Sequence, residues 1–273
     1  MGRLEKFRMF LQEEEKSPLT VEKYIRDVGA FLRFLGEMPL SKTAVLSYKT
    51  HLTEAYAVSS VNSMLSSVNS YLSWLGRGEC RVKTLKIQRQ TFRSGERELT
   101  QGEYRRLLEA CREDRELRLL LQAICVTGIR VSEHRWITVE ALRSGCAQVR
   151  NKGKHRPVLI PKKLCKTLLA YAKSRGITDG PVFLGRGGKP LDRSRIWARM
   201  KALCPKAGVD PRKVFPHNLR HLFAVVFYTL ERDIVRLADI LGHASVNTTR
   251  IYTLETGETH RKQIEKMPLL YIT

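Results

Sequence analysis

The feature that most constrains the fold is a helical repeat of apolar residues in the N-terminal third of the chain. Apolar side chains recur at the i, i+3, i+4 spacing from residue 21 to 35 and again from 61 to 75. Each stretch stops at a glycine, Gly36 or Gly76, as helices commonly do. Shorter helices are expected at about 3–15 and 41–55. Residues 1–92 are therefore predicted to form a small helical bundle.

The next segment lacks any sustained period and reads as a basic linker, residues 77 to about 97. A second domain, 98–273, then opens with a capping box in which Thr100 precedes Glu103 by three residues. A β-hairpin is expected from 146 to 160 because β-branched residues flank an Asn-Lys-Gly-Lys turn. The remaining apolar stretches predict helices at 115–127, 162–174, 193–207, 217–230, 233–241 and 245–252. The expected fold is mainly α with a small antiparallel β-sheet.

The charge of the chain points to a polyanionic partner. It has 49 Lys and Arg against 27 Asp and Glu, a net charge of +22. Residues 93–273 hold 35 basic and 18 acidic residues, or +17, and residues 1–92 hold 14 and 9, or +5. A single basic run is as often a solvated surface as a binding site. An excess of this size over one domain favours nucleic acid over an acidic membrane.

Cysteine usage and hydropathy indicate a cytoplasmic protein. None of the six cysteines forms a C-x-x-C pair, so neither a zinc site nor a redox motif is indicated. The longest apolar run, 223–230, is too short to span a bilayer. We expect a soluble cytoplasmic protein associated with the nucleoid and without a membrane partner.

Four short blocks carry residues suited to breaking a phosphodiester without a metal. Such a reaction needs a nucleophile, cations that neutralise the non-bridging oxygens, and an acid for the leaving oxygen. Arginine suits the second task because its planar fork pairs with phosphate. The blocks are T-G-I-R-V-S-E at 127–133, N-K-G-K-H-R at 151–156, H-N-L-R-H-L-F-A at 217–224 and L-G-H-A-S-V-N-T-T-R-I-Y-T at 241–253.

In this order the blocks resemble the signatures of the tyrosine recombinase family, which includes phage and transposon integrases and Xer-type proteins. The N-terminal bundle is similar to the family's SAM-like core-binding domain, so the resemblance covers nearly the whole chain. It implies a DNA recombinase that needs neither ATP nor metal. It also implies a two-domain, C-shaped clamp on DNA, in which 1–92 is the core-binding domain and 98–273 the catalytic domain.

The resemblance assigns a role to each catalytic residue. Tyr252 would attack the scissile phosphate to give a 3′-phosphotyrosine and a free 5′ hydroxyl, and Lys152 would protonate the leaving oxygen. Two arginines would clamp the phosphate, two histidines would complete its shell, and a carboxylate would brace the first arginine. These five residues are Arg130 and Arg220, His217 and His243, and Glu133. His217 would also handle the tyrosine proton.

Further basic residues are expected to contact DNA, and they are Lys23, Arg26, Lys154, Arg156 and Arg250. For Lys154 and Arg250, as for His155 and His221, a structural role is an equal alternative. The chain departs from the family after Glu133, where His134-Arg135-Trp136 is more polar than the apolar stretch expected there.

The expected partner is double-stranded DNA that carries recombination sites. Four copies would assemble on two sites, each docking its C-terminal tail, about residues 259–270, into a neighbour, and DNA-bending accessory proteins are allowed for. The tail could instead fold back on its own domain. Two rival functions remain, a type IB topoisomerase that relaxes supercoils and a non-catalytic DNA-binding protein on the same fold.

Overall fold

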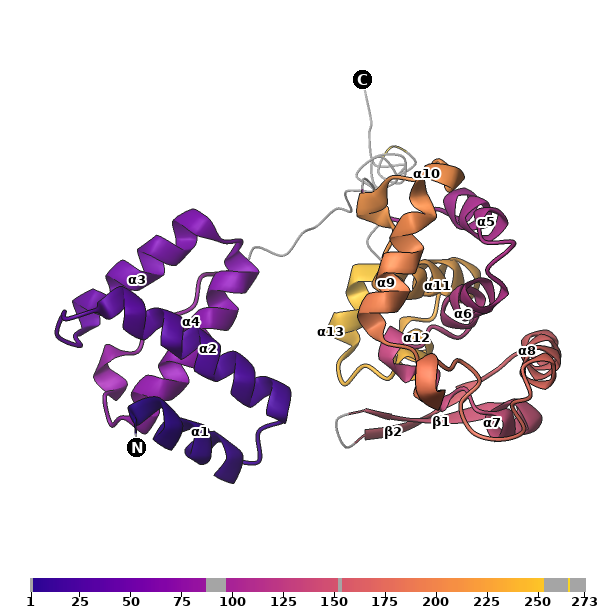
Figure 1. Ribbon diagram of the computed structural model, residues 1–273. Helices are drawn as coiled ribbons and strands as arrows, with labels where there is room; N and C mark the ends of the chain where they lie inside the picture. The colour runs from indigo at the N-terminus through magenta and orange to yellow at the C-terminus, as the bar shows by residue number, and fades with distance from the viewer. Residues whose placement is uncertain (1, 87–96, 152–153, 253–264, 266–273) are drawn as a thin grey trace, which may run out of the picture. The chain divides into compact units, whose positions relative to one another are not determined.

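A computed structural model describes residues 2–86, 97–151, 154–252 and 265 of the 273 (Figure 1). Contacts between residues divide the chain into two units, Met1–Gln90 and Thr91–Thr273. Residues 87–96 of the expected linker, the Lys152 turn and nearly all of the expected tail lie outside the described residues. Among the helices of the described segments, none has both the length and the apolar character to cross a membrane.

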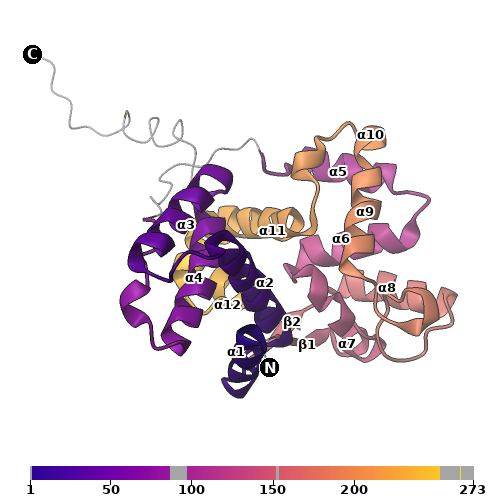
Figure 2. The ribbon, with the colours of Figure 1, turned by 60° about the vertical axis from the view of Figure 1, so that its left-hand side comes forward.

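The first unit is a bundle of helices, as predicted. Figures 1 and 2 show α2 alongside α4, its main packing partner in this unit. Ser17 and Ser41 cap the N-termini of α2 and α3 by accepting backbone N–H bonds. The elements are α1 (Arg3–Glu13), α2 (Pro18–Leu35), α3 (Lys42–Ala55), α4 (Val58–Trp74) and the short 3₁₀-helix η1 (Gly78–Cys80).

A buried ionic network joins α2 to α4 inside this unit. Asp27 is buried, and its Oδ2 accepts bonds from Lys23 Nζ at 2.5 Å and from Ser67 Oγ at 2.9 Å. Lys23 Nζ also donates to the Ser63 carbonyl and to Ser67 Oγ, both at 3.1 Å. Lys23 therefore has an internal role in the bundle. The Arg26 side chain, 73% exposed, faces solvent.

The second unit is also mainly helical and contains the one sheet found in the described residues. The Thr100 capping box is present, with Thr100 and Glu103 bonded to each other's backbone N–H. Its helices are α5 (Gln101–Ala110), α6 (Arg115–Thr127), α7 (Val139–Ser144), α8 (Lys162–Ser174), α9 (Arg193–Ala202), α10 (Cys204–Ala207), α11 (Pro216–Glu231), α12 (Ile234–Leu241) and α13 (Val246–Thr249). Short 3₁₀-helices are η3 (Val131–Trp136), η4 (Arg186–Gly188), η5 (Pro211–Lys213) and η6 (Arg250–Tyr252).

The sheet is an antiparallel hairpin of β1 (Cys146–Asn151) and β2 (Lys154–Leu159). Val149 lies opposite Arg156, and Gln148 lies opposite Pro157. Proline is tolerated there because each strand of a two-stranded sheet has a free edge that needs no N–H donor. The predicted fold class, mainly α with a small antiparallel sheet, is confirmed.

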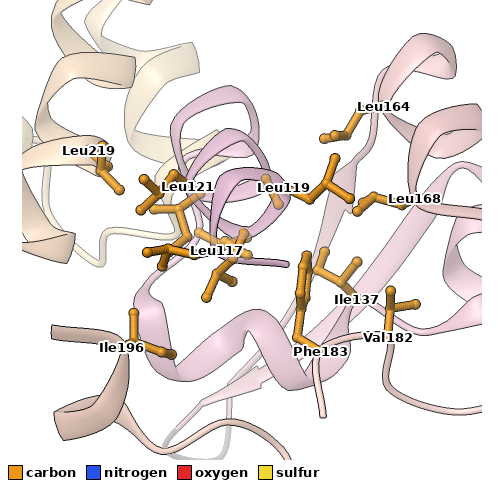
Figure 3. Close-up of a cluster of buried hydrophobic side chains, with 14 of the residues drawn as sticks. Leu117, Leu119, Leu121, Ile137, Leu164, Leu168, Val182, Phe183, Ile196 and Leu219 are labelled. Atoms are coloured by element: carbon orange, nitrogen blue, oxygen red, sulfur yellow. The ribbon is translucent and has the colours of Figure 1, made fainter. Parts of the chain in front are cut away.

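The core of the second unit forms around α6. Figure 3 shows leucines of α6 pointing toward apolar side chains of α8, α9, α11 and the segment 182–183. In Figure 1, α11 runs beside α6, with which it makes its most extensive packing. This packing brings the start of α11 to the C-terminal end of α6, where the T-G-I-R block begins.

Two local predictions were incomplete. The single helix expected at 193–207 is divided into α9 and α10, and Pro205, which has no backbone N–H, lies at the start of the second piece. The residues from 131 to 144 were not predicted as helical, yet they form η3 and α7. The polar His134 within η3 is buried and packs edge-on against Phe183.

Candidate active site

Arg130 is presented by a tight turn at the end of α6. Gly128 ends that helix with a φ of +65°, and a Cβ at this position would lie 2.4 Å from Phe223 Cδ1. Only glycine meets both requirements. The turn leads to Arg130, which precedes η3, and the Arg130 side chain is 37% exposed. It therefore remains accessible to a ligand.

Glu133 braces Arg130 from one turn later in the chain. Its carboxylate, 2% exposed, accepts from the Arg130 backbone N–H at 2.8 Å and from Arg130 Nη1 at 2.9 Å. Burial alone would raise the pKa of Glu133. The Arg130 backbone N–H and the charges of Arg156 and Arg130 outweigh burial and lower this pKa. The carboxylate is thus ionised and holds Arg130 in one orientation.

Arg220 is an almost fully enclosed cation on the first turns of α11. Its side chain donates from Nη1 to the Gly128 carbonyl at 2.7 Å and from Nη2 to the Leu241 carbonyl at 2.8 Å. Burial, followed by the charge of Arg130, lowers the pKa of Arg220 to about 10. The guanidinium is still protonated at neutral pH, and it joins the ends of α6 and α12 to α11.

His243 lies in the turn that follows α12, beside Arg220. Its Nε2 is 3.0 Å from Arg220 Nη2, and its Nδ1 is 2.8 Å from Thr249 Oγ1. Burial, followed by the charges of Arg220 and Arg130, lowers the pKa of His243 to about 4. The ring is therefore neutral at physiological pH and is held at both nitrogens.

His217 stands at the N-terminal end of α11 and lines a pocket of about 620 Å³ together with Arg130 and Arg220. Its enclosure by neighbours, followed by the charges of Arg220 and Arg130, lowers the pKa of His217. The ring is therefore neutral at physiological pH, which is the form that can act as a general base. The full lining is Arg130, Val131, Ser132, Arg193, Ser194, Trp197, Phe215, Pro216, His217 and Arg220. The pocket thus presents two arginines and a histidine to one space.

Tyr252 ends η6 and is only 3% exposed. Its ring stacks near His243, with centroids 6.1 Å apart and planes 18° apart, and meets His221 edge-on at 5.0 Å. It packs in a small apolar cluster with Ala224, Leu237 and Leu241. Tyr252 contacts the histidine whose Nε2 lies 3.0 Å from Arg220 Nη2. The structure thus gathers Arg130, Arg220, His217, His243 and Tyr252 in one region.

Other predicted residues lie elsewhere or have additional partners. Lys152 is outside the described residues, and Lys154 pairs with Asn151 in the hairpin. Arg250 is exposed on η6, and His155 is exposed on β2. Lys23 and Arg26 belong to the first unit. His221 Nε2 lies 3.6 Å from Glu98 Oε1, and the His221 ring contacts Tyr252 edge-on.

Among the lining residues that the sequence does not predict, three belong to one helix. Arg193, Ser194 and Trp197 come from the first turns of α9, which Asp192 caps by accepting two backbone N–H bonds. The available signal in the sequence is a Trp among the basic residues of R-S-R-I-W-A-R at 193–199, a combination common at nucleic-acid surfaces. No motif draws attention to this helix, because its role depends on where the fold places it.

Comparisons with known proteins cover both units. The chain matches the family model "Phage integrase family" at residues 97–258 and the model "Phage integrase, N-terminal SAM-like domain" at 4–79. It is 31% identical over 281 residues to tyrosine recombinase XerA of Pyrococcus furiosus, covering 98% of this chain and 94% of the relative.

Two solved structures have a similar fold. One is XerH site-specific recombinase bound to its difH substrate in a pre-cleavage complex, with a TM-score of 0.71, 20% identity and coverage of 96% of this chain and 83% of the other. The second is a lambda integrase tetramer bound to a Holliday junction, with a TM-score of 0.73, 18% identity and coverage of 92% and 76%.

Proposed function

Because the chain belongs to the phage integrase family of tyrosine recombinases, enzymes of site-specific DNA recombination, we propose that it cleaves and rejoins DNA through a covalent bond to Tyr252. One observation carries the proposal. Arg220 bonds to the Gly128 carbonyl, the Leu241 carbonyl and His243, and so joins three of the four sequence blocks around one pocket. A scissile phosphate bound in this pocket would meet Arg130, Arg220 and His217 together.

Each side chain has a definite task in this mechanism. The Tyr252 hydroxyl oxygen forms a bond to phosphorus, and the bond from phosphorus to the 5′ oxygen breaks. The tyrosine proton passes to the neutral His217, and Lys152 protonates the departing oxygen. Arg130 and Arg220 neutralise the charge that builds on the non-bridging oxygens. An incoming 5′ hydroxyl then reverses these steps and releases the tyrosine.

The burial of Tyr252 requires one conformational step. Its ring packs against Leu237 and Leu241, and it is not among the residues that line the pocket between Arg130 and His217. We propose that η6 moves when DNA binds, which brings the hydroxyl to the phosphate.

Cleavage without metal or ATP is part of the proposal. Two arginines already supply the positive charge that a metal would otherwise bring, and the phosphotyrosine conserves the energy of the broken bond. Cleavage should therefore persist in excess EDTA. Loss of cleavage that magnesium restores would contradict this part.

The decisive experiment captures the covalent intermediate. Nicked duplexes tiled across the DNA that flanks the gene would be incubated with the full-length protein, so that the short cleaved strand diffuses away and prevents rejoining. We expect a denaturant-resistant adduct whose peptide map places the DNA on Tyr252. An adduct on Tyr228, Tyr271 or a serine would refute the assignment. Relaxation of a supercoiled plasmid without recombined products would favour the topoisomerase alternative.

Assembly into a tetramer through the C-terminal tail is a further proposal. The lambda integrase tetramer on a Holliday junction supports it by similarity of fold. Truncation after Glu258 should weaken synapsis and recombination while some DNA binding remains. Recombination by the truncated protein at the full rate would contradict the proposal.

A further inference from the structure

Arg156 is enclosed within the second unit, although it lies on the β-hairpin. Its side chain is 13% exposed, and its two terminal nitrogens point to different segments. Nη2 donates to Glu133 Oε2 at 2.6 Å, and Nη1 donates to the Ile240 carbonyl at 2.8 Å. One guanidinium thus connects β2 to the start of η3 and to the end of α12.

The stem of Arg156 packs against the turn that carries His243. A Cβ at Gly242 would lie 2.3 Å from Arg156 Cδ and 2.8 Å from Arg156 Nε. Gly242 also has a φ of +65°, a conformation that side chains disfavour. Both the backbone conformation and the approach of Arg156 therefore require glycine here.

Each partner of Arg156 is itself attached to a predicted phosphate ligand. Glu133 accepts a hydrogen bond from Arg156 at Oε2 and another from the Arg130 side chain at Oε1. The Ile240 carbonyl accepts a hydrogen bond from Arg156. The next carbonyl along the chain, that of Leu241, accepts one from Arg220. Arg156 thus contacts the residues that hold Arg130 and Arg220 in place, and it contacts the turn that carries His243.

We propose that Arg156 is a positioning residue, which holds the β1–β2 hairpin in place against Arg130, through Glu133, and against the turn that presents His243. This inference rests on the proposed function, because it assigns Arg156 to the same reaction. Its role depends on the guanidinium fork. An ammonium group is a point charge, and it cannot donate in two fixed directions to Glu133 and Ile240 as the planar group does.

The first test separates positioning from DNA contact. We would compare Arg156→Met with Arg143→Met, which removes the same charge from an exposed position on α7. The probe is a nicked duplex that the wild-type protein converts to an adduct. With protein in excess, Arg156→Met should slow single-turnover cleavage by about 10- to 100-fold, as the loss of an orienting partner does elsewhere. Its affinity for DNA should remain close to that of Arg143→Met.

Two further readouts would respond to positioning and not to a general structural role. Arg156→Lys should recover part of the lost rate, because it keeps a charge near Glu133 but loses the second bond. The acid limb of the cleavage pH profile should also move to higher pH in Arg156→Met. Glu133 faces Arg130 in its own turn, Arg156 from β2 and the charge of Arg220 from α11. Removal of one of these cations makes its protonated form easier to populate.

The outcomes are distinct. Cleavage by Arg156→Met at the wild-type rate would overturn the inference. So would a weakened affinity with a salt dependence reduced by about one phosphate, since that result identifies a DNA contact. If Arg156→Met fails to fold, the cleavage rate of Arg156→Lys is measured instead. Cleavage by Arg156→Lys at the wild-type rate would also overturn the inference. The absence of any wild-type adduct would overturn the proposed function itself, and this inference with it.

Discussion

Arg220 Nη2 lies 3.0 Å from His243 Nε2, and this contact determines which nitrogen of the histidine carries the proton. A guanidinium has only donors, so Nε2 must accept and Nδ1 must hold the hydrogen. Nδ1 then donates to Thr249 Oγ1 at 2.8 Å. His243 is thereby held as one neutral tautomer, in keeping with its lowered pKa of about 4.

The two arginines should differ in what they contribute to stability. Arg220→Ala would leave the carbonyls of Gly128 and Leu241 without their donor, so the free energy of unfolding should fall by about 3 kcal/mol. Arg130→Ala should lower the free energy of unfolding by only about 1 kcal/mol, because the Arg130 side chain is partly exposed and Glu133 retains its ion pair with Arg156. Both variants should slow cleavage by ~10²-fold or more. Urea unfolding and single-turnover cleavage measure the two effects, and an equal loss of stability would contradict this account.

Tyr252→Phe should abolish the covalent adduct and leave DNA affinity unchanged. The substitution removes one oxygen and keeps the ring contacts with Leu237 and Leu241, so the free energy of unfolding should change by no more than about 1 kcal/mol. Tyr228→Phe is the matched control, since Tyr228 packs against the same apolar cluster. Denaturing gels and thermal unfolding test both variants. An adduct that survives in Tyr252→Phe would show that another residue is the nucleophile.

His134 should make the second unit sensitive to acid. Its Nε2 is buried without a hydrogen-bond partner among the described residues, while Nδ1 lies 2.5 Å from the Val131 carbonyl. Burial lowers the pKa of His134 below its ordinary value of 6.5. The unfolded chain therefore binds the proton more readily. The contribution of neutral His134 to the free energy of unfolding is therefore complete above about pH 6.5. It decreases as the pH falls below that value, with a slope of at most about 1.4 kcal/mol per pH unit.

His134→Leu should flatten this dependence between about pH 6.5 and pH 5. His217 and His243 also have lowered pKa values and act in the same direction, so part of the slope should remain. Urea unfolding at several pH values measures the slope. An identical slope in the variant and the wild type would exclude His134 as a contributor.

Lys23 and Arg26 should respond differently to substitution by methionine. Lys23→Met would leave the buried Asp27 without its closest cation, and this should destabilise the first unit by about 3 kcal/mol. Arg26→Met should cost less than about 1 kcal/mol, because Arg26 Nη2 lies 3.3 Å from Asp27 Oδ1 but the Arg26 side chain is 73% exposed. If Arg26 contacts a phosphate as predicted, its loss should reduce the slope of log affinity against log salt by about 0.9. An unchanged slope for Arg26→Met would remove Arg26 from the DNA surface.

The sequence alone was sufficient for the features that depend on neighbouring residues. The apolar periods at 21–35 and 61–75 predicted α2 and α4, and the Thr100–Glu103 spacing predicted the cap of α5. The four sequence blocks were sufficient to indicate the family, because the characteristic residues of each block lie within a few positions of one another. Such signals arise within one or two turns of backbone and do not require knowledge of the fold.

The tertiary structure alone decided which distant residues support the site. Arg156 meets Glu133 across 23 positions and Ile240 across 84, and Arg220 meets Gly128 across 92. The sequence predicts Arg156 only as a DNA contact, and it does not predict Arg193 or Trp197 as site residues. Tyr252 was expected as a nucleophile, and only the fold reveals that its ring is buried. These relationships depend on how α6, α11, α12 and the hairpin pack together, and a local pattern carries no information about that packing.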